Sequence, residues 1–196
     1  MIGQENKGEC KMPRRPFINY KNNYFVESGT FQGDGVKEAL LNGFKYIFSY
    51  EVYEPIYLYS KNRFKDYPDI KILFKSSITM MDEIKDINEP ITFWLDGHYS
   101  RGMTSWDPNC VHPLLKELEV ISQHHIKNHT ICIDDRRLLK KTNFIETTEA
   151  STDFEVTEEE VIQALYKINP KYNIEYKDGA FSLDVIIASP PFHSIL

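Results

Sequence analysis

Short apolar runs alternate with segments of helical periodicity along most of the chain. The runs are rich in β-branched and aromatic residues and cover residues 24–26, 46–50, 70–74, 91–95 and 131–133. Between them, apolar residues recur at helical spacing in residues 34–42, after Pro55, and from Pro113 to about His125. Because strands that alternate with helices are joined by right-handed crossovers, this pattern predicts a doubly wound α/β domain with a mostly parallel sheet.

The C-terminal part of the chain departs from this alternation. Thr157 and the three glutamates at 158–160 are typical of a capping box, so we expect a helix from there to about Ile168. Two strand patterns follow, at residues 172–176 and 181–188. They flank Asp178-Gly179, a strong signal for a hairpin turn. The predicted sheet therefore ends in an antiparallel β-hairpin.

Composition is that of one well-packed domain. Of the 196 residues, 41% are apolar and 13% aromatic, which is enough for a sizeable core. We expect residues 1–20 to form an N-terminal extension and residues 21–196 a single domain. The net charge of −6 argues against a broad nucleic-acid-binding surface, which would need a basic face.

The cellular compartment of the protein is indicated by the absence of membrane-span and secretory patterns in the sequence and by its cysteines. No apolar run approaches the roughly 20 residues of a membrane span, and no secretory signal is visible at the start. The three cysteines, at irregular spacing, indicate a reducing compartment rather than a disulfide framework. We therefore expect a cytoplasmic protein with no membrane or nucleic-acid partner, and the sequence leaves a homo-oligomer open.

A glycine-rich turn joins the first predicted strand to the first predicted helix. Residues 27–35 read Glu-Ser-Gly-Thr-Phe-Gln-Gly-Asp-Gly, without the usual dinucleotide spacing of glycines. Glycine lets the backbone approach a ligand closely, and the helix N-terminus adds exposed N–H groups. Glu27 at the start of the turn would repel a pyrophosphate but attract an ammonium group. A glycine-rich connector without a ligand is the alternative.

Glu51 ends the second predicted strand. In folds of this kind, an acid about 20 residues beyond the glycine turn binds the ribose hydroxyls of a nucleotide. The alternative is a solvated acid at a strand end, as Glu54 would be. Tyr50 and Tyr53 flank Glu51 and either pack on an adenine ring or belong to the core.

Three aspartates follow the fourth and fifth predicted strands. Asp96 ends one strand, and Asp134 and Asp135 end the next. Since sequential parallel strands are usually neighbours, the three carboxylates should converge at one edge of the sheet. Carboxylates so close together share a proton or hold a cation, and oxygen ligands suit Mg²⁺. Aspartates that merely terminate strands are the alternative.

Together these segments resemble a known family. Glu27 with its glycine turn, Glu51, the segment 96–100 (Asp-Gly-His-Tyr-Ser) and the end of the fifth strand are similar to class I S-adenosylmethionine-dependent methyltransferases. The likeness is greatest to the metal-dependent O-methyltransferases of sugars and macrolides, the macrocin O-methyltransferase-like branch. The segment 125–129 lacks the Gly-Gly turn that this branch often has before the fifth strand, and the first motif is looser.

The resemblance implies a Rossmann-like fold, two cofactors and a set of site residues. Mg²⁺ would be held by Asp96, Asp134 and Asp135. The methionine part of S-adenosylmethionine would lie on the glycine turn, its ribose on Glu51, and its adenine near the serines after the third strand. The implied cofactor-binding residues are Glu27, Ser28, Gly29, Thr30, Gly33, Glu51, Ser76 and Ser77.

The function that follows is Mg²⁺-assisted methylation of a hydroxyl on a small polar acceptor, such as a sugar or a diol. His98, beside Asp96, is the candidate general base, because its ordinary pKa lies near 6.5. Trp106 and Asp107 would line the acceptor side. Two alternatives stay open. One is another Mg²⁺-dependent enzyme, such as a hydrolase using Asp96, His98 and the two aspartates at 134–135. The other is a non-catalytic binding protein of the same fold.

Overall fold

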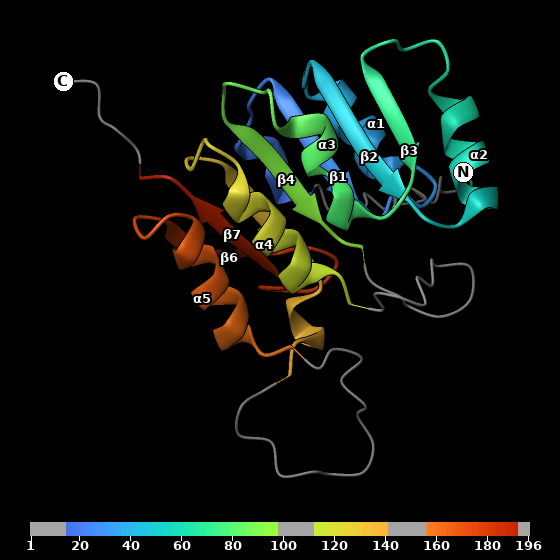
Figure 1. Cartoon of the computed structure of the whole chain (residues 1–196). Helices are drawn as coiled ribbons and strands as arrows, with labels where there is room; N and C mark the ends of the chain where they lie inside the picture. The colour runs from blue at the N-terminus through green and yellow to red at the C-terminus, as the bar shows by residue number, and fades with distance from the viewer. Residues whose placement is uncertain (1–14, 98–111, 141–155, 192–196) are drawn as a thin grey trace, which may run out of the picture.

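The chain folds around one seven-stranded sheet (Figure 1). The computed structural model describes residues 15–97, 112–140 and 156–191. The strands are β1 (Tyr24–Ser28), β2 (Tyr46–Glu51), β3 (Ile70–Phe74), β4 (Ile91–Leu95), β5 (Thr130–Ile133), β6 (Asn173–Lys177) and β7 (Val185–Ser189). Their order in the sheet is β3-β2-β1-β4-β5-β7-β6, with β7 antiparallel to both of its neighbours and all other pairs parallel. The predicted fold class is therefore confirmed.

Helices cover both faces of this sheet. They are α1 (Asp34–Leu41), α2 (Glu54–Arg63), α3 (Met81–Ile84), α4 (Leu114–Gln123) and α5 (Glu158–Ile168). The predicted capping box begins α5, since the Thr157 hydroxyl accepts from the N–H of Glu160 and the Glu160 carboxylate accepts from the N–H of Thr157. None of the helices in the described residues is both long and apolar enough to cross a membrane.

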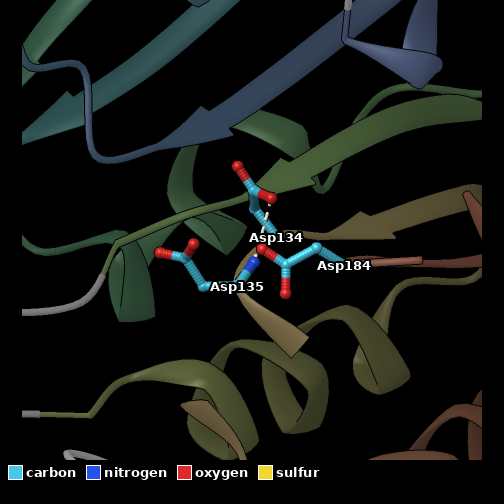
Figure 2. Close-up of side chains that lie close together, drawn as sticks. All are labelled: Asp134, Asp135 and Asp184. Carbon is cyan, nitrogen blue, oxygen red and sulfur yellow. Dashed lines mark hydrogen bonds between the residues drawn. The ribbon is translucent and has the colours of Figure 1, made fainter. Parts of the chain in front are cut away.

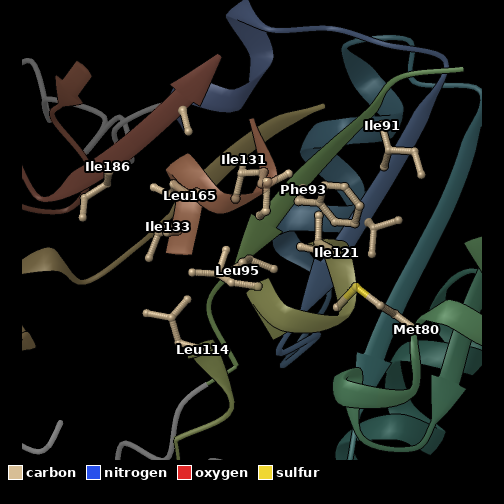
Figure 3. Close-up of a cluster of buried hydrophobic side chains, with 14 of the residues drawn as sticks. Met80, Ile91, Phe93, Leu95, Leu114, Ile121, Ile131, Ile133, Leu165 and Ile186 are labelled. Atoms are coloured by element: carbon tan, nitrogen blue, oxygen red, sulfur yellow. The ribbon is translucent and has the colours of Figure 1, made fainter. Parts of the chain in front are cut away.

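Two apolar cores hold the layers together. The larger lies beneath α3, α4 and α5 (Figure 3), where Phe93 and Ile131 of the central strands meet Ile121 and Leu165 of the helices. The smaller lies on the opposite face, beneath α1 and α2. It includes Phe17, whose fully buried ring lies 4.7 Å from that of Phe25. Because both faces are covered, β4 and β7 are buried along their whole length, which explains their mostly apolar sequences.

The strand order places a crevice at the carboxyl end of β1. From β1 the chain builds outward through β2 to β3, and then returns to the other side of β1 as β4. The connections after β1 and β4 therefore leave the sheet in opposite directions, and the space between them is where open α/β sheets bind ligands. Ser28 and Leu95 are register partners at this end of the two strands, so the residues that follow them face one another.

The closing hairpin is confirmed, but its turn is longer than Asp178-Gly179 predicts. β7 begins at Val185, so residues 178–184 form a loop. One oxygen of Asp178 accepts from the Ser182 hydroxyl (3.0 Å) and from the N–H of Leu183 (2.8 Å), which closes the loop locally. Leu183 has a φ of 54°. Aspartate side chains commonly organise turns by such bonds, and here this bond replaces the tight two-residue turn.

Two buried histidines link four elements at the amino end of the sheet. The Nδ1 atom of His129 accepts from the N–H of Ile91 (3.1 Å), so the ring proton lies on Nε2. That nitrogen donates to Nδ1 of His124 (3.1 Å), whose Nε2 donates to the carbonyl of Ile84 (2.9 Å). Burial lowers the pKa of His129 to about 3, so this ring is neutral in the arrangement. The pair thereby joins the ends of α3 and α4 to the starts of β4 and β5.

Candidate active site

Glu27 is the second-last residue of β1, between β2 and β4, and is almost fully buried. One of its carboxylate oxygens accepts from the Ser49 hydroxyl at 2.6 Å. The other lies against Gly35, where any added Cβ would overlap it, so the start of α1 packs directly on the acid. Burial raises the pKa of Glu27 to about 7, because removal from water disfavours the charged form. A cationic ligand group here would restore the charge of the carboxylate.

The turn after β1 follows the course that its glycines predict. Gly29 has a φ of 79°, and a Cβ on it would lie 2.5 Å from the carbonyl oxygen of Asp96. Gly33, with a φ of 81°, immediately precedes α1. Thr30 is buried and its hydroxyl lies 2.7 Å from that of Ser49. Only glycine allows both the positive φ and the close approach at position 29, so this residue sets the width of the crevice.

Glu51 is held at the rim of the same crevice by backbone groups. Its two oxygens accept from the N–H groups of Phe31 (3.0 Å), Val52 (3.0 Å) and Tyr53 (2.9 Å). Burial nevertheless raises its pKa, and these three bonds oppose the rise. Phe31 has a φ of 46°, rare for an aromatic residue, and its ring is exposed. Glu51 therefore fixes the shape of the glycine turn as well as presenting a carboxylate beside it.

The two tyrosines beside Glu51 differ. Tyr50 is buried in the larger core and its hydroxyl donates to Glu83 at 2.9 Å, so it belongs to the core. Tyr53 is exposed at the rim.

Of the serines after β3, Ser77 is buried, and its hydroxyl donates to the carboxylate of Glu117 on α4. Sequence reasoning missed Glu117, because its position in α4 reads as one polar residue of an amphipathic helix.

Asp96 follows β4 and lies beside Glu27 and the aspartates of β5. Its backbone N–H donates to the carbonyl (3.3 Å) and the hydroxyl (3.2 Å) of Ser28. Burial, and then the neighbouring charges of Asp134, Asp135 and Glu27, raise its pKa well above the usual range. Asp96 and Asp134 thus follow adjacent strands, as the bond from the Asp134 N–H to the Leu95 carbonyl (3.1 Å) also indicates, and the joint use of their carboxylates stays a prediction.

The carboxylates that come closest together are a different trio from the predicted one. Asp134, Asp135 and Asp184 each offer an oxygen within 4.8 Å of the others (Figure 2), and Asp96 is not part of that group. Asp184 precedes β7, so sequence reasoning had no means of bringing it to β5. Burial, followed by the charge of Asp135, raises the pKa of Asp134 to about 6. We call these three residues the aspartate cluster.

The aspartate cluster fits Mg²⁺ only in part. Carboxylate oxygens at these separations are suitable ligands for a hard cation. However, the Arg137 guanidinium donates to both Asp135 and Asp184, so a cationic group already lies against two of the three acids. Mg²⁺ binding by Asp96, Asp134 and Asp135 therefore stays a prediction. His98, Trp106 and Asp107 lie outside the residues that the structure describes.

Comparisons with known proteins bear on the fold. No family model and no curated protein matches the sequence. SMU.1697c of Streptococcus mutans, assigned as a methyltransferase and solved with SAH, has a TM-score of 0.58 at 12% identity, covering 91% of this chain and 99% of that chain. An rRNA methylase of Streptococcus thermophilus has a TM-score of 0.53 at 10% identity, covering 90% and 92%. Human N-acetylserotonin methyltransferase, solved with SAM, has a TM-score of 0.52 at 15% identity, covering 89% of this chain and 50% of that chain.

At such low identity these matches concern the fold. The chain has the Rossmann-like fold of S-adenosylmethionine-dependent methyltransferases, with the hairpin that closes its sheet. The fold implied by the resemblance is thereby confirmed. The macrocin-like branch, and the residue roles that come with it, stay predictions.

Proposed function

We propose that the chain binds S-adenosylmethionine in the crevice between β1, β2 and β4 and transfers its methyl group to a hydroxyl. The observation that carries the proposal is the buried carboxyl of Glu27, packed on Gly35 and bonded to Ser49, beside a turn that only glycine can make. A carboxyl whose pKa is raised by burial is complementary to an ammonium group, which the methionine part of the cofactor supplies.

The rest of the cofactor extends along the carboxyl ends of β2 and β3. Glu51 accepts the ribose hydroxyls in the proposal, since each oxygen of a carboxylate can accept more than one hydrogen bond. Ser77, tied to Glu117, lies after β3 on the side where the adenine would end. The exposed ring of Tyr53 lies beside the ribose site and is available for stacking.

Among the residues that the structure describes, we assign Asp96 as the group that accepts the proton of the substrate hydroxyl. In the reaction, the acceptor oxygen attacks the methyl carbon, the carbon–sulfur bond breaks, and S-adenosylhomocysteine leaves. The hydroxyl proton passes to the Asp96 carboxylate, whose raised pKa suits it to take up a proton. His98 stays the alternative base implied by the sequence. We derive no step through Mg²⁺; if bound, it would lower the pKa of the hydroxyl.

The proposal is tested first by binding and then by turnover. Calorimetric titration with S-adenosylhomocysteine should show a single saturable site. Acceptors should then be screened for release of S-adenosylhomocysteine from S-adenosylmethionine, using sugars, vicinal diols and short RNAs. RNA is included because the similar structures include rRNA methylases. Absence of binding would contradict the proposal as a whole, whereas binding without turnover on any acceptor would favour a non-catalytic binding protein.

A pH-dependent affinity is expected from Glu27. Its pKa of about 7 means that below neutrality the carboxyl is protonated, so an ammonium ligand must displace a proton to bind. S-adenosylhomocysteine should therefore bind about tenfold more weakly at pH 5.5 than at pH 7, a range in which an α-amino group stays charged. Calorimetry at both pH values gives the ratio. The Glu27→Gln variant is the control and should lose most of this dependence; an equal dependence in both proteins would contradict the assignment.

A further inference from the structure

Arg137 lies in a site built from two elements that are far apart in the sequence. Its guanidinium donates to Asp135, which follows β5, and to Asp184, which precedes β7. The ring of Phe181 lies against the same guanidinium, 4.3 Å from its central carbon to the ring centroid. In addition, the backbone N–H of Arg137 donates to the second oxygen of Asp184 at 2.8 Å. The side chain therefore bridges β5 to the loop between β6 and β7.

The negative charge of its carboxylates explains why the aspartate cluster needs a cationic partner. The side chain of Asp184 is only 2% exposed, and a buried carboxylate is costly unless it is paired and hydrogen-bonded. The Asp134 carboxylate belongs to the same cluster and is itself partly buried. The loop contributes as well, since Gly179 lies so near Asp134 that an added Cβ would be 3.2 Å from its oxygen. The Arg137 guanidinium donates through Nη1 to one oxygen of each of two carboxylates and so compensates part of this charge where it is most buried.

We propose that Arg137 is an internal cation of the aspartate cluster, two members of which, Asp134 and Asp135, the resemblance assigns to a divalent ion. It is a positioning residue: it holds Asp135 and Asp184 together and keeps Phe181 and the β6–β7 loop against β5. The guanidinium and a metal ion compete for the same carboxylate oxygens. As long as Arg137 is hydrogen-bonded to Asp135 and Asp184, the cluster does not bind Mg²⁺ at millimolar concentrations of the ion. This inference does not depend on the proposed methyl transfer.

Removing the guanidinium should create a metal site. The experiment is calorimetric titration of the full chain with MnCl₂, and separately with MgCl₂, near pH 7.5. The wild-type protein should show no saturable binding at millimolar metal, which is the opposite of what the resemblance implies for Asp96, Asp134 and Asp135. Arg137→Gln, which removes the positive charge, should gain saturable binding. Its affinity for the metal should be at least tenfold tighter than the weakest affinity that the wild-type titration would detect. A merely structural role for Arg137 would lower stability in the variant but would not create affinity for a cation.

Arg136 supplies the matched control, because it is the neighbouring arginine and binds other groups. Its Nε donates to Glu158 (2.8 Å), and its guanidinium lies over the ring of Tyr176. Arg136→Gln should remain without metal affinity. If Arg137→Gln does not fold, Arg137→Met keeps an unbranched apolar stem against Phe181 and serves in its place.

Each outcome decides the inference without reference to catalysis. Saturable metal binding by the wild-type protein, as tight as that of either Arg137 variant, overturns it. A folded Arg137 variant that binds no metal also overturns it. Metal affinity that appears in the Arg137 variant alone, and that disappears again in Arg137→Gln combined with Asp184→Asn, supports it. Because no cofactor is present in these titrations, a failure of the proposed methyl transfer would be seen separately.

Discussion

Replacing Glu51 with alanine is expected to weaken S-adenosylhomocysteine binding about a hundredfold. Hydrogen bonds to a charged group contribute about 1.5–3 kcal/mol each, and a tenfold change in affinity corresponds to about 1.4 kcal/mol. Losing even one ribose contact at the upper end of this range gives the expected effect. The variant also frees the N–H of Phe31, so the glycine turn loses its anchor at the same time. Calorimetric titration of both proteins measures the ratio directly.

Glu54 offers the control for this experiment. It is an exposed acid in the first turn of α2, three positions along from Glu51, and none of its described contacts involves the glycine turn. Glu54→Ala changes the net charge by the same amount and should leave the affinity within about twofold, as expected of a surface site. Equal affinity of the Glu51→Ala and wild-type proteins would remove Glu51 from the ribose site.

The buried histidine pair should give the fold an acid-sensitive contribution of about 2 kcal/mol between pH 7 and pH 5. The pKa of His129 is lowered to about 3 in the folded chain, against about 6.5 when unfolded, so the unfolded state binds more protons below pH 6.5. The stability associated with neutral His129 is therefore fully present above pH 6.5 and is lost as the pH falls toward 3.

The wild-type protein alone would not reveal this effect. The raised pKa values of Glu27 and Asp134 act in the opposite sense, because those carboxyls take up protons in the folded state first and stabilise it as the pH falls. The measurement is therefore the difference in free energy of unfolding between wild type and His129→Asn, by urea denaturation at pH 7 and pH 5. That difference should shrink by about 2 kcal/mol at the lower pH. The same substitution at exposed His125 is the control; an equal change there would contradict the prediction.

Most of the fold could be predicted because its signals are local. β3 and β4 have the bounds that their apolar runs predict, and α5 begins at its capping box and ends at Ile168. The acids at the carboxyl ends of β1, β2 and β4 could be placed in one crevice because strand order and the glycine turn locate them. The short helix α3 was not anticipated, since four residues are too few to show a period.

What the sequence could not show depends on contacts across the fold. Asp184 joins the aspartate cluster because β7 inserts beside β5, and no local pattern relates the two segments. Glu117 meets Ser77 because α4 packs against the short turn after β3 that contains Ser77. The long β6–β7 loop follows from the bonds of the Asp178 side chain, which compete with the tight turn that Asp178-Gly179 favours. In each case the partner of a side chain is fixed by how the segments pack in the folded chain, and no local sequence pattern indicates it.

The position of β7 also has a consequence for synthesis of the chain. It is the last described strand in the sequence, yet it lies between β5 and β6 and pairs with both. While the ribosome is still translating the residues before Val185, β5 has an open edge made of the mostly apolar sequence Thr-Ile-Cys-Ile. An unpaired edge of this kind is prone to join other chains. This half of the sheet can therefore be completed only after β7 has been synthesised, and a nascent chain that stalls before β7 emerges is a natural substrate for chaperones.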